Sequence, residues 1–270
     1  MAARPRGAVD KRIAWPAKSG NGADDTLASE AQSAGPLEFV VQVERAYEAL
    51  LGTDFADAVT GLGGKLLYAG ELDAGGRALV VAANIAGAAS LAVTADRTAQ
   101  KQALRDGVAD FLVNSLDEAL RILKNQLRKR EPVAVCVGLE PSAVESEMSE
   151  RGVAPDLLRG DVTAVERGAQ KQQTKWITWT VDSAPALWLP KIDMIAIDSL
   201  PQDAWRTRRW LRLAPRYLGR LADGFRVLHC DAPDAARIAG RIATASQNGE
   251  VGVGVALVSS MRAESLRSWK

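Results

Sequence analysis

The chain has 270 residues, of which 47% are hydrophobic and 25% are charged. This composition is ordinary for a soluble globular protein with one large domain or two small ones. The formal net charge of +1 excludes a global field that would draw in nucleic acid or acidic lipid. We therefore expect neither a nucleic-acid partner nor a membrane surface.

The cysteines and the N-terminal residues indicate the compartment. Cys136 and Cys230 lie in apolar, strand-like runs, which favours buried free thiols and requires no oxidising environment. The first residues are basic but lack the apolar core of a signal peptide. The expected location is cytoplasmic.

The first segments in chain order differ sharply in pattern. Residues 1–35 are rich in alanine, glycine, serine and charge without a sustained period, and we predict that they are disordered. Residues 36–51 carry apolar side chains at helical spacing, and Gly52 follows them. This pattern predicts an amphipathic helix that ends at Gly52.

From residue 65 the chain alternates between strand and helix patterns. A short apolar run at 66–69 predicts a buried strand, Gly70 ends it, and helix formers follow at 78–86. A second strand is expected at 91–93, before Asp96. Strand, glycine turn, helix, strand and acid form the layout of a Rossmann phosphate-binding unit.

The uncharged stretch that covers residues 78–95 is long enough to raise the question of a membrane span. Its alanine, glycine and polar residues favour a buried helix followed by a buried strand.

The same alternation continues along the chain. Ser115 and Glu118 form a capping box, which predicts the start of a helix. Residues 160–174 are polar and are expected to form a connection. Further strands are expected at 111–113, 132–137, 153–158, 176–181, 192–197, 226–230 and 251–258, and further helices at 116–130, 141–150, 203–213 and 234–246.

This rhythm predicts an α/β fold, a Rossmann-like parallel sheet with helices on both faces, extended by a C-terminal α/β segment. The expected divisions are residues 1–35, 36–166 and 167–270. A single continuous sheet and two lobes both remain open.

Four stretches carry a resemblance to a known family, and their order and spacing match as a set. From about residue 65 to residue 163, the chain resembles the NAD-binding domain of urocanase (urocanate hydratase). The stretches are Asn84 to Val93, Gly107 to Asp110, Ser115 to Leu120 and Arg151 to Leu158.

The resemblance implies NAD as the cofactor, held by a glycine loop after the first strand. Gly70, Gly75 and Gly76 are the glycines that this chain retains from the family's loop, and glycine lets backbone N–H groups approach a pyrophosphate. Glu71 and Asp73 add two negative charges where the phosphates would rest. We therefore expect the loop to bind NAD weakly.

Four further residues are candidates for contact with the cofactor. Arg77 lies in the first turn of the helix and is expected to reach a phosphate. Asp96 has the spacing of an acid that binds the ribose hydroxyls, although a helix cap explains it equally well. Asp161 and Thr163 match the family's D-Q-T-S-x-H segment, whose other positions differ here.

The resemblance also defines what is missing. In urocanases the NAD domain is inserted in a larger core that carries catalysis, and we find no counterpart of that core in this sequence. We therefore expect a urocanase-related protein linked to histidine catabolism that is non-catalytic or depends on a partner subunit or a second copy. Any activity would be that of a urocanate hydratase-like lyase. The alternative is a self-contained enzyme or small-ligand-binding protein that uses the same crevice for a less anionic ligand.

Other candidate sites have simpler explanations. His229 is the only histidine, and beside Cys230 and Asp231 it could suggest nucleophile chemistry, but neighbours on a strand face opposite ways. We interpret it as a partly buried histidine, and we expect no metal site because zinc needs more histidine or cysteine ligands. The arginines between 205 and 212 could contact nucleic acid. We instead expect an amphipathic helix whose arginine side chains face the solvent. Asp198 is expected at the end of the 192–197 strand. We expect an aspartate in this position to stabilise a turn or cap a helix and not to contact a ligand.

Overall fold

The computed structural model describes residues 35–169, 174–181, 183–251 and 255–261. The segment predicted to be disordered, 1–35, therefore lies outside the described residues except for Gly35. The described elements are α2 (Pro36–Leu51), β1 (Leu66–Glu71), α3 (Ala74–Ala86), β2 (Ala89–Val93), α4 (Arg97–Arg105), β3 (Phe111–Val113), α5 (Leu116–Lys129), β4 (Val133–Val137), α6 (Pro141–Glu150), β5 (Leu157–Leu158), α7 (Arg159–Ala169), β6 (Thr174–Val181), α8 (Pro185–Ser199), α9 (Trp205–Leu218), η1 (Gly219–Ala222), β7 (Phe225–Asp231), α10 (Ala232–Gln247) and β8 (Val255–Met261).

The N-terminal half is built on a five-stranded parallel sheet with the order β3-β4-β2-β1-β5. Side chains of alternate strand residues face α2 and α3 on one side and α5 and α6 on the other, so that each face has its own hydrophobic cluster. The predicted Rossmann-like α/β fold with helices on both faces is confirmed.

The uncharged stretch at 78–95 forms part of helix α3 and the whole of strand β2. Every side chain from Ala78 to Thr94 is buried, which explains the lack of charge without a membrane. Across the described segments, no helix combines the length and apolarity that a membrane crossing requires.

The C-terminal segment is also α/β, but its sheet is antiparallel. Strands β7, β6 and β8 lie side by side in that order, and β6 pairs antiparallel with both neighbours. The parallel rhythm of the first half therefore does not continue here.

The secondary structure expected for two stretches was also wrong. The apolar run 192–197, expected to be a strand, belongs to the second half of helix α8, so Asp198 lies within this helix and not at the end of a strand. Ile192, Ala196 and Ile197 point inward at helical spacing, while Met194 is 55% exposed on the opposite side, so apolar side chains occur on both faces of the helix. The polar stretch 160–174, expected to be a connection, contains most of α7.

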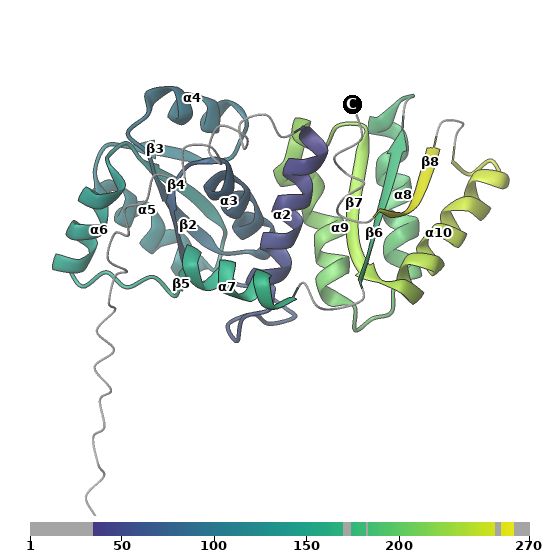
Figure 1. The fold of residues 1–270 in the computed structure, drawn as a ribbon, viewed down its shortest axis with the longest axis horizontal. Helices are drawn as coiled ribbons and strands as arrows, with labels where there is room; N and C mark the ends of the chain where they lie inside the picture. The colour runs from purple at the N-terminus through teal and green to yellow at the C-terminus, as the bar shows by residue number, and fades with distance from the viewer. Residues whose placement is uncertain (1–34, 170–173, 182, 252–254, 262–270) are drawn as a thin grey trace, which may run out of the picture.

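The chain forms two separate sheets and not one continuous sheet. A shared layer of helices joins them. Figure 1 shows α2 standing between the sheets, where it contacts α3 on one side and β7 on the other. The Tyr47 hydroxyl of α2 donates to the Arg206 carbonyl (2.7 Å), and Arg209 Nε of α9 donates to the Ile85 carbonyl of α3 (3.0 Å). Buried residues of both halves form one cluster.

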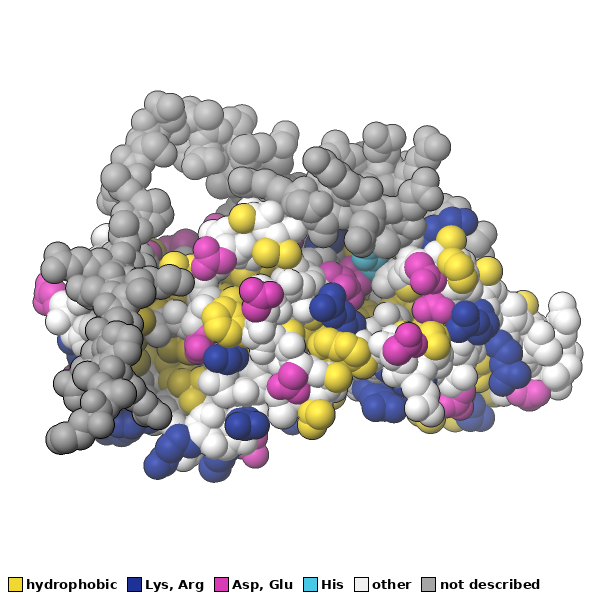
Figure 2. Space-filling view, turned by 90° about the horizontal axis from the view of Figure 1, so that it is seen from below, with side chains coloured by type: hydrophobic (Ala, Val, Ile, Leu, Met, Phe, Trp, Pro, Cys, Tyr) yellow, Lys and Arg dark blue, Asp and Glu magenta, His cyan; other side chains and the backbone are white. Residues whose placement is uncertain are grey.

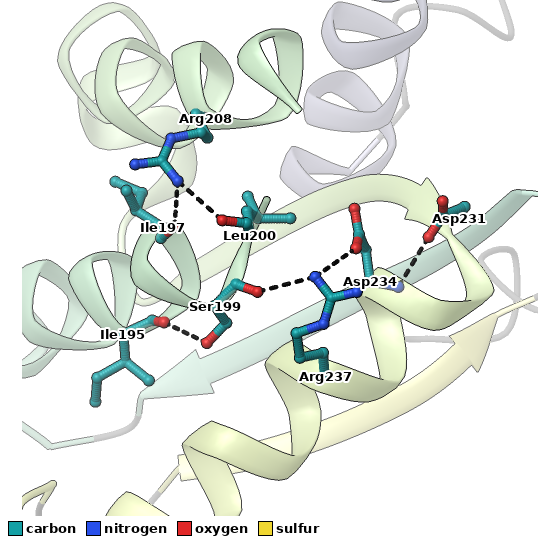
Figure 3. A network of polar contacts seen from close by, with 8 residues as sticks. All are labelled: Ile195, Ile197, Ser199, Leu200, Arg208, Asp231, Asp234 and Arg237. Atoms are coloured by element: carbon teal, nitrogen blue, oxygen red, sulfur yellow. Dashed lines mark hydrogen bonds and ion pairs between the residues drawn. The ribbon is translucent and has the colours of Figure 1, made fainter. Parts of the chain in front are cut away.

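Two arginines satisfy the carbonyls at the C-terminal end of α8 (Figure 3). Arg208 Nη1 donates to the carbonyls of Ile197 (3.1 Å) and Leu200 (3.0 Å), and Arg237 Nη1 donates to that of Ser199 (3.2 Å). Cations at this end also complement the helix dipole. Arg208 and Arg209 therefore make internal contacts, whereas the expectation placed the arginines of this helix in water.

Candidate functional site

The candidate site, called the crevice below, is the carboxyl edge of the parallel sheet at the neighbouring strands β1 and β5. Strands β2, β4 and β3 lie on one side of β1, and β5 lies on the other. The connection from β1 to β2 and the connection from β4 to β5 therefore run in opposite directions across the sheet. In open α/β sheets, ligands bind at such a switch point. Helix α3 follows β1 and α7 follows β5, so both helices begin at this crevice.

Two loop glycines are required by backbone geometry. Gly70 has a φ of +70°, which favours glycine. At Gly76, a Cβ atom would lie 2.0 Å from the carbonyl oxygen of Glu71. Glycine here lets the start of α3 pack directly on the end of β1, a requirement that exists with or without a nucleotide.

Asp73 fills the position at the start of α3 where an anion would bind. It is the N-cap of the helix, and its Oδ1 accepts a hydrogen bond from the Gly76 N–H at 2.7 Å. The helix N-terminus thus already has a carboxylate of its own.

Arg159, the first residue of α7, reaches Asp73 from the other side, and both side chains of the pair stay partly exposed, 36% for Arg159 and 50% for Asp73. Its Nη2 lies 3.0 Å from Oδ1 and 3.1 Å from Oδ2 of Asp73, and its Nη1 donates to the Glu71 carbonyl at 3.3 Å. The sequence reasoning missed Arg159. A basic residue directly after the last strand was visible, but its meaning depends on the pairing of β1 with β5.

Arg77, which was expected to reach a phosphate, forms an ion pair with Asp106 at the end of α4. Both side chains are about one-fifth exposed, so the guanidinium is held on that side of α3.

The remaining candidates all have local structural roles. Asp96 follows β2 and caps α4, where its Oδ1 accepts from the Thr98 N–H at 2.7 Å. Asp161 lies in the first turn of α7 and accepts from the Leu158 N–H at 3.3 Å. The Thr163 hydroxyl donates to the Arg159 carbonyl one turn earlier at 2.9 Å. Contact of these residues with a cofactor stays a prediction.

These residues do not fit a dinucleotide in the arrangement described. A pyrophosphate at the start of α3 needs free N–H groups and positive potential. Here the Gly76 N–H is bonded to Asp73, and Arg159 is paired with the same carboxylate. A phosphate would have to displace a carboxylate whose charge remains a few ångströms away.

Comparison with protein-family models gives a match to the urocanase Rossmann-like domain over residues 43–169. These residues form a urocanase Rossmann-like domain. The match confirms the family that the four sequence stretches indicated, and it covers just under half of the chain. The family's domain is of the NAD-binding kind in general.

A second group of ionisable residues lies where the urocanase-type domain meets the antiparallel sheet. Glu44 of α2 is 1% exposed, and its Oε2 accepts no hydrogen bond from the described residues. Burial raises its pKa well above the usual value, and the neighbouring Glu48 raises it further. Burial also raises the pKa of Glu48 to about 7, although Arg206 opposes this shift.

His229 and Cys230 belong to this junction and have little reactivity there. The His229 ring stacks on Trp176 with ring centroids 4.6 Å apart, and burial lowers its pKa to about 4, in keeping with a partly buried histidine. Burial raises the pKa of the Cys230 thiol to about 12. Because the nucleophile is the thiolate, this cysteine is inert at neutral pH.

Proposed function

We propose that this chain is a non-catalytic, cytoplasmic relative of urocanase that acts in histidine catabolism together with a partner or a second copy, and that holds NAD only weakly. The observation that carries the proposal is the ion pair between Asp73 and Arg159 across the crevice. It supports weak binding because the cofactor would have to separate two of the chain's own charged groups.

The architecture beyond the match supports the loss of catalysis. Residues after 174 form an antiparallel sheet whose helices pack against the urocanase-type domain. Two of the ionisable side chains at the crevice, Asp73 and Arg159, are engaged with each other. The purified chain is therefore expected not to consume urocanate, and sustained loss of urocanate absorbance at catalytic enzyme concentration would contradict the proposal.

The matched variants Asp73→Ser and Asp96→Ser test the NAD prediction. Serine keeps the N-cap hydrogen bond in each case and removes one negative charge. We expect titration calorimetry with NAD⁺ to give a millimolar dissociation constant for the unmodified chain and about tenfold tighter binding for Asp73→Ser, because Arg159 is released toward the phosphates. Asp96→Ser should not tighten binding, and a loss there would support the ribose contact.

Micromolar binding by the unmodified chain would contradict the proposed weak binding. Equal affinities for the unmodified chain and Asp73→Ser would show that this carboxylate is not the obstacle.

The alternative function, a less anionic ligand in the same crevice, is supported by the two carboxyl-bearing residues Glu71 and Asp73. Adenosine distinguishes the two proposals because it has the nucleoside of NAD without phosphates. Tighter binding of adenosine than of NAD⁺ favours the alternative. The pathway assignment is tested by gene order, since neighbouring genes for other histidine-degrading enzymes are expected.

A further inference from the structure

Helix α8 has an apolar outer side in addition to its apolar inner side. It lies between α9 and α10 and packs against the antiparallel sheet (Figure 1). On its outer side, Leu187 is 52% exposed and Met194 is 55% exposed. On the face of the molecule shown in Figure 2, hydrophobic side chains reach the surface among charges of both signs. A helix that is apolar all round is normally covered on every side, which indicates that a partner covers α8.

The exposed residues in the middle of α8 form a row along one side of the helix. They are Leu187, Pro190, Lys191, Met194 and Asp198. Spacings of three and four residues place all of them on the same side. By contrast, neither α9 nor α10, all of whose residues are described, exposes a large hydrophobic side chain. The row on α8 is therefore distinct from the outer sides of the two helices that flank it.

The two charged residues of the row are arranged symmetrically. Lys191 and Asp198 lie seven positions apart, and Met194 and Ile195 lie midway between them. Lys191 Nζ lies 4.6 Å from the centre of the Trp188 ring. Across the described ranges, neither Lys191 nor Asp198 belongs to an ion pair. Opposite charges at equal distances from a centre make the row complementary to a second row turned by 180°.

We infer that α8 forms a homodimer interface in which the α8 helices of two copies pack antiparallel. A two-fold axis between Met194 and Ile195 places Lys191 of each copy opposite Asp198 of the other copy. Met194 then packs against Ile195 across the axis, and Leu187 meets Pro201, which is exposed just after the helix. The two ion pairs fix the direction and register of the helices, which apolar contacts alone leave open.

This inference does not rest on the proposed function. Helix α8 lies outside residues 43–169, so the interface belongs to the C-terminal segment and not to the matched domain. The experiment reads the mass of the protein without NAD or urocanate, so its failure is distinguishable from failure of the proposed function.

The test is sedimentation equilibrium of the full chain. We expect a dimer with a dissociation constant of about 10 μM. Met194→Asp should weaken the dimer about tenfold or more, because it places two carboxylates beside the axis. Lys191→Glu should also weaken it about tenfold, since like charges would then face each other. The double variant Lys191→Glu/Asp198→Lys restores opposite charges and should regain the affinity of the unmodified chain to within about threefold.

Leu104→Asp is the control, because Leu104 is also an exposed apolar residue (41%) but lies on α4. It should leave the dimer intact. Circular dichroism checks that each variant keeps its fold, and the charge variants stand even if Met194→Asp misfolds.

Three results would overturn the inference. The first is a chain that stays monomeric at about 100 μM, including one that instead binds vesicles of anionic lipid through the same row. The second is a dimer that a folded Met194→Asp or Lys191→Glu variant leaves unchanged, because the copies would then pair through another surface. The third is a folded double variant that dimerises no better than Lys191→Glu, because Lys191 and Asp198 would then not face each other.

Discussion

Replacing Gly76 with alanine is expected to destabilise the protein by about 3 kcal/mol or more. The new Cβ would lie 2.0 Å from the carbonyl oxygen of Glu71, and this oxygen belongs to the strand backbone, which cannot move aside as a side chain can. The start of α3 would have to shift away from β1. Thermal unfolding should show a melting temperature lower by roughly 6–12 °C for a chain of this size.

Gly75→Ala is the matched control for this substitution. At Gly75 the nearest atom to a new Cβ is Arg159 Nη2 at 2.7 Å, the far end of a flexible side chain. Because alanine is the better helix former, the variant should be neutral or slightly stabilised. If Gly76→Ala were equally well tolerated, the close packing of α3 on β1 would not be the reason for this glycine.

The second large effect is expected at the buried carboxyl of Glu44. Glu44→Gln should raise the free energy of unfolding by about 1–3 kcal/mol at pH 8 and leave it unchanged below pH 4.5. The cause is the cost of either burying the charge or taking up a proton on folding, which a neutral amide avoids. Chemical denaturation across this pH range, followed by tryptophan fluorescence, measures the difference.

The unmodified chain should lose stability as the pH rises from 5 to 8. Groups with raised pKa, such as Glu48 at about 7 against its ordinary 4.5, contribute stability that is present below pH 4.5 and is lost as the pH rises through the folded value. Glu44 acts in the same direction, and so does Asp193, whose pKa burial raises to about 6. His229, with its pKa lowered to about 4, acts in the opposite direction between pH 4 and 6.5 and offsets part of the loss.

Glu38→Gln is the control for the pH experiment, because Glu38 is exposed in the first turn of the same helix. It should leave the slope of stability against pH unchanged. A Glu44→Gln variant with the same slope as the unmodified chain would show that Glu44 ionises without penalty.

Local signals in the sequence were reliable where short-range physics determines the structure. The capping box at Ser115 predicted the start of α5, and the Glu118 N–H does donate to the Ser115 hydroxyl at 3.3 Å. Glu118 reaches back one residue further than expected, to the N–H of Asn114. The loop glycines were named with the help of the family resemblance, and Asp73 was named only for its negative charge, so its role as the N-cap of α3 was not predicted.

Features that depend on contacts between distant segments were not accessible in this way. The partnership of Arg159 with Asp73 requires β5 to lie beside β1, although 88 positions separate Glu71 from the arginine that donates to its carbonyl. Helix α8 was taken for a strand because apolar side chains occur on both of its sides, so its pattern lost the helical period. The antiparallel order of the second sheet also depends on such pairings.

Helix α2 has a consequence for anyone who wishes to study the urocanase-type domain alone. The family match begins at residue 43, in the middle of a helix that starts at Pro36 and packs between α3 and α7 on one side and β7 on the other. A fragment trimmed to the matched boundaries would lose the first two turns of this helix and bare the side that normally meets β7, including Glu44. The matched domain is smaller than the unit that shares one hydrophobic cluster, so we expect expression trials to need the chain from residue 36 through the antiparallel sheet.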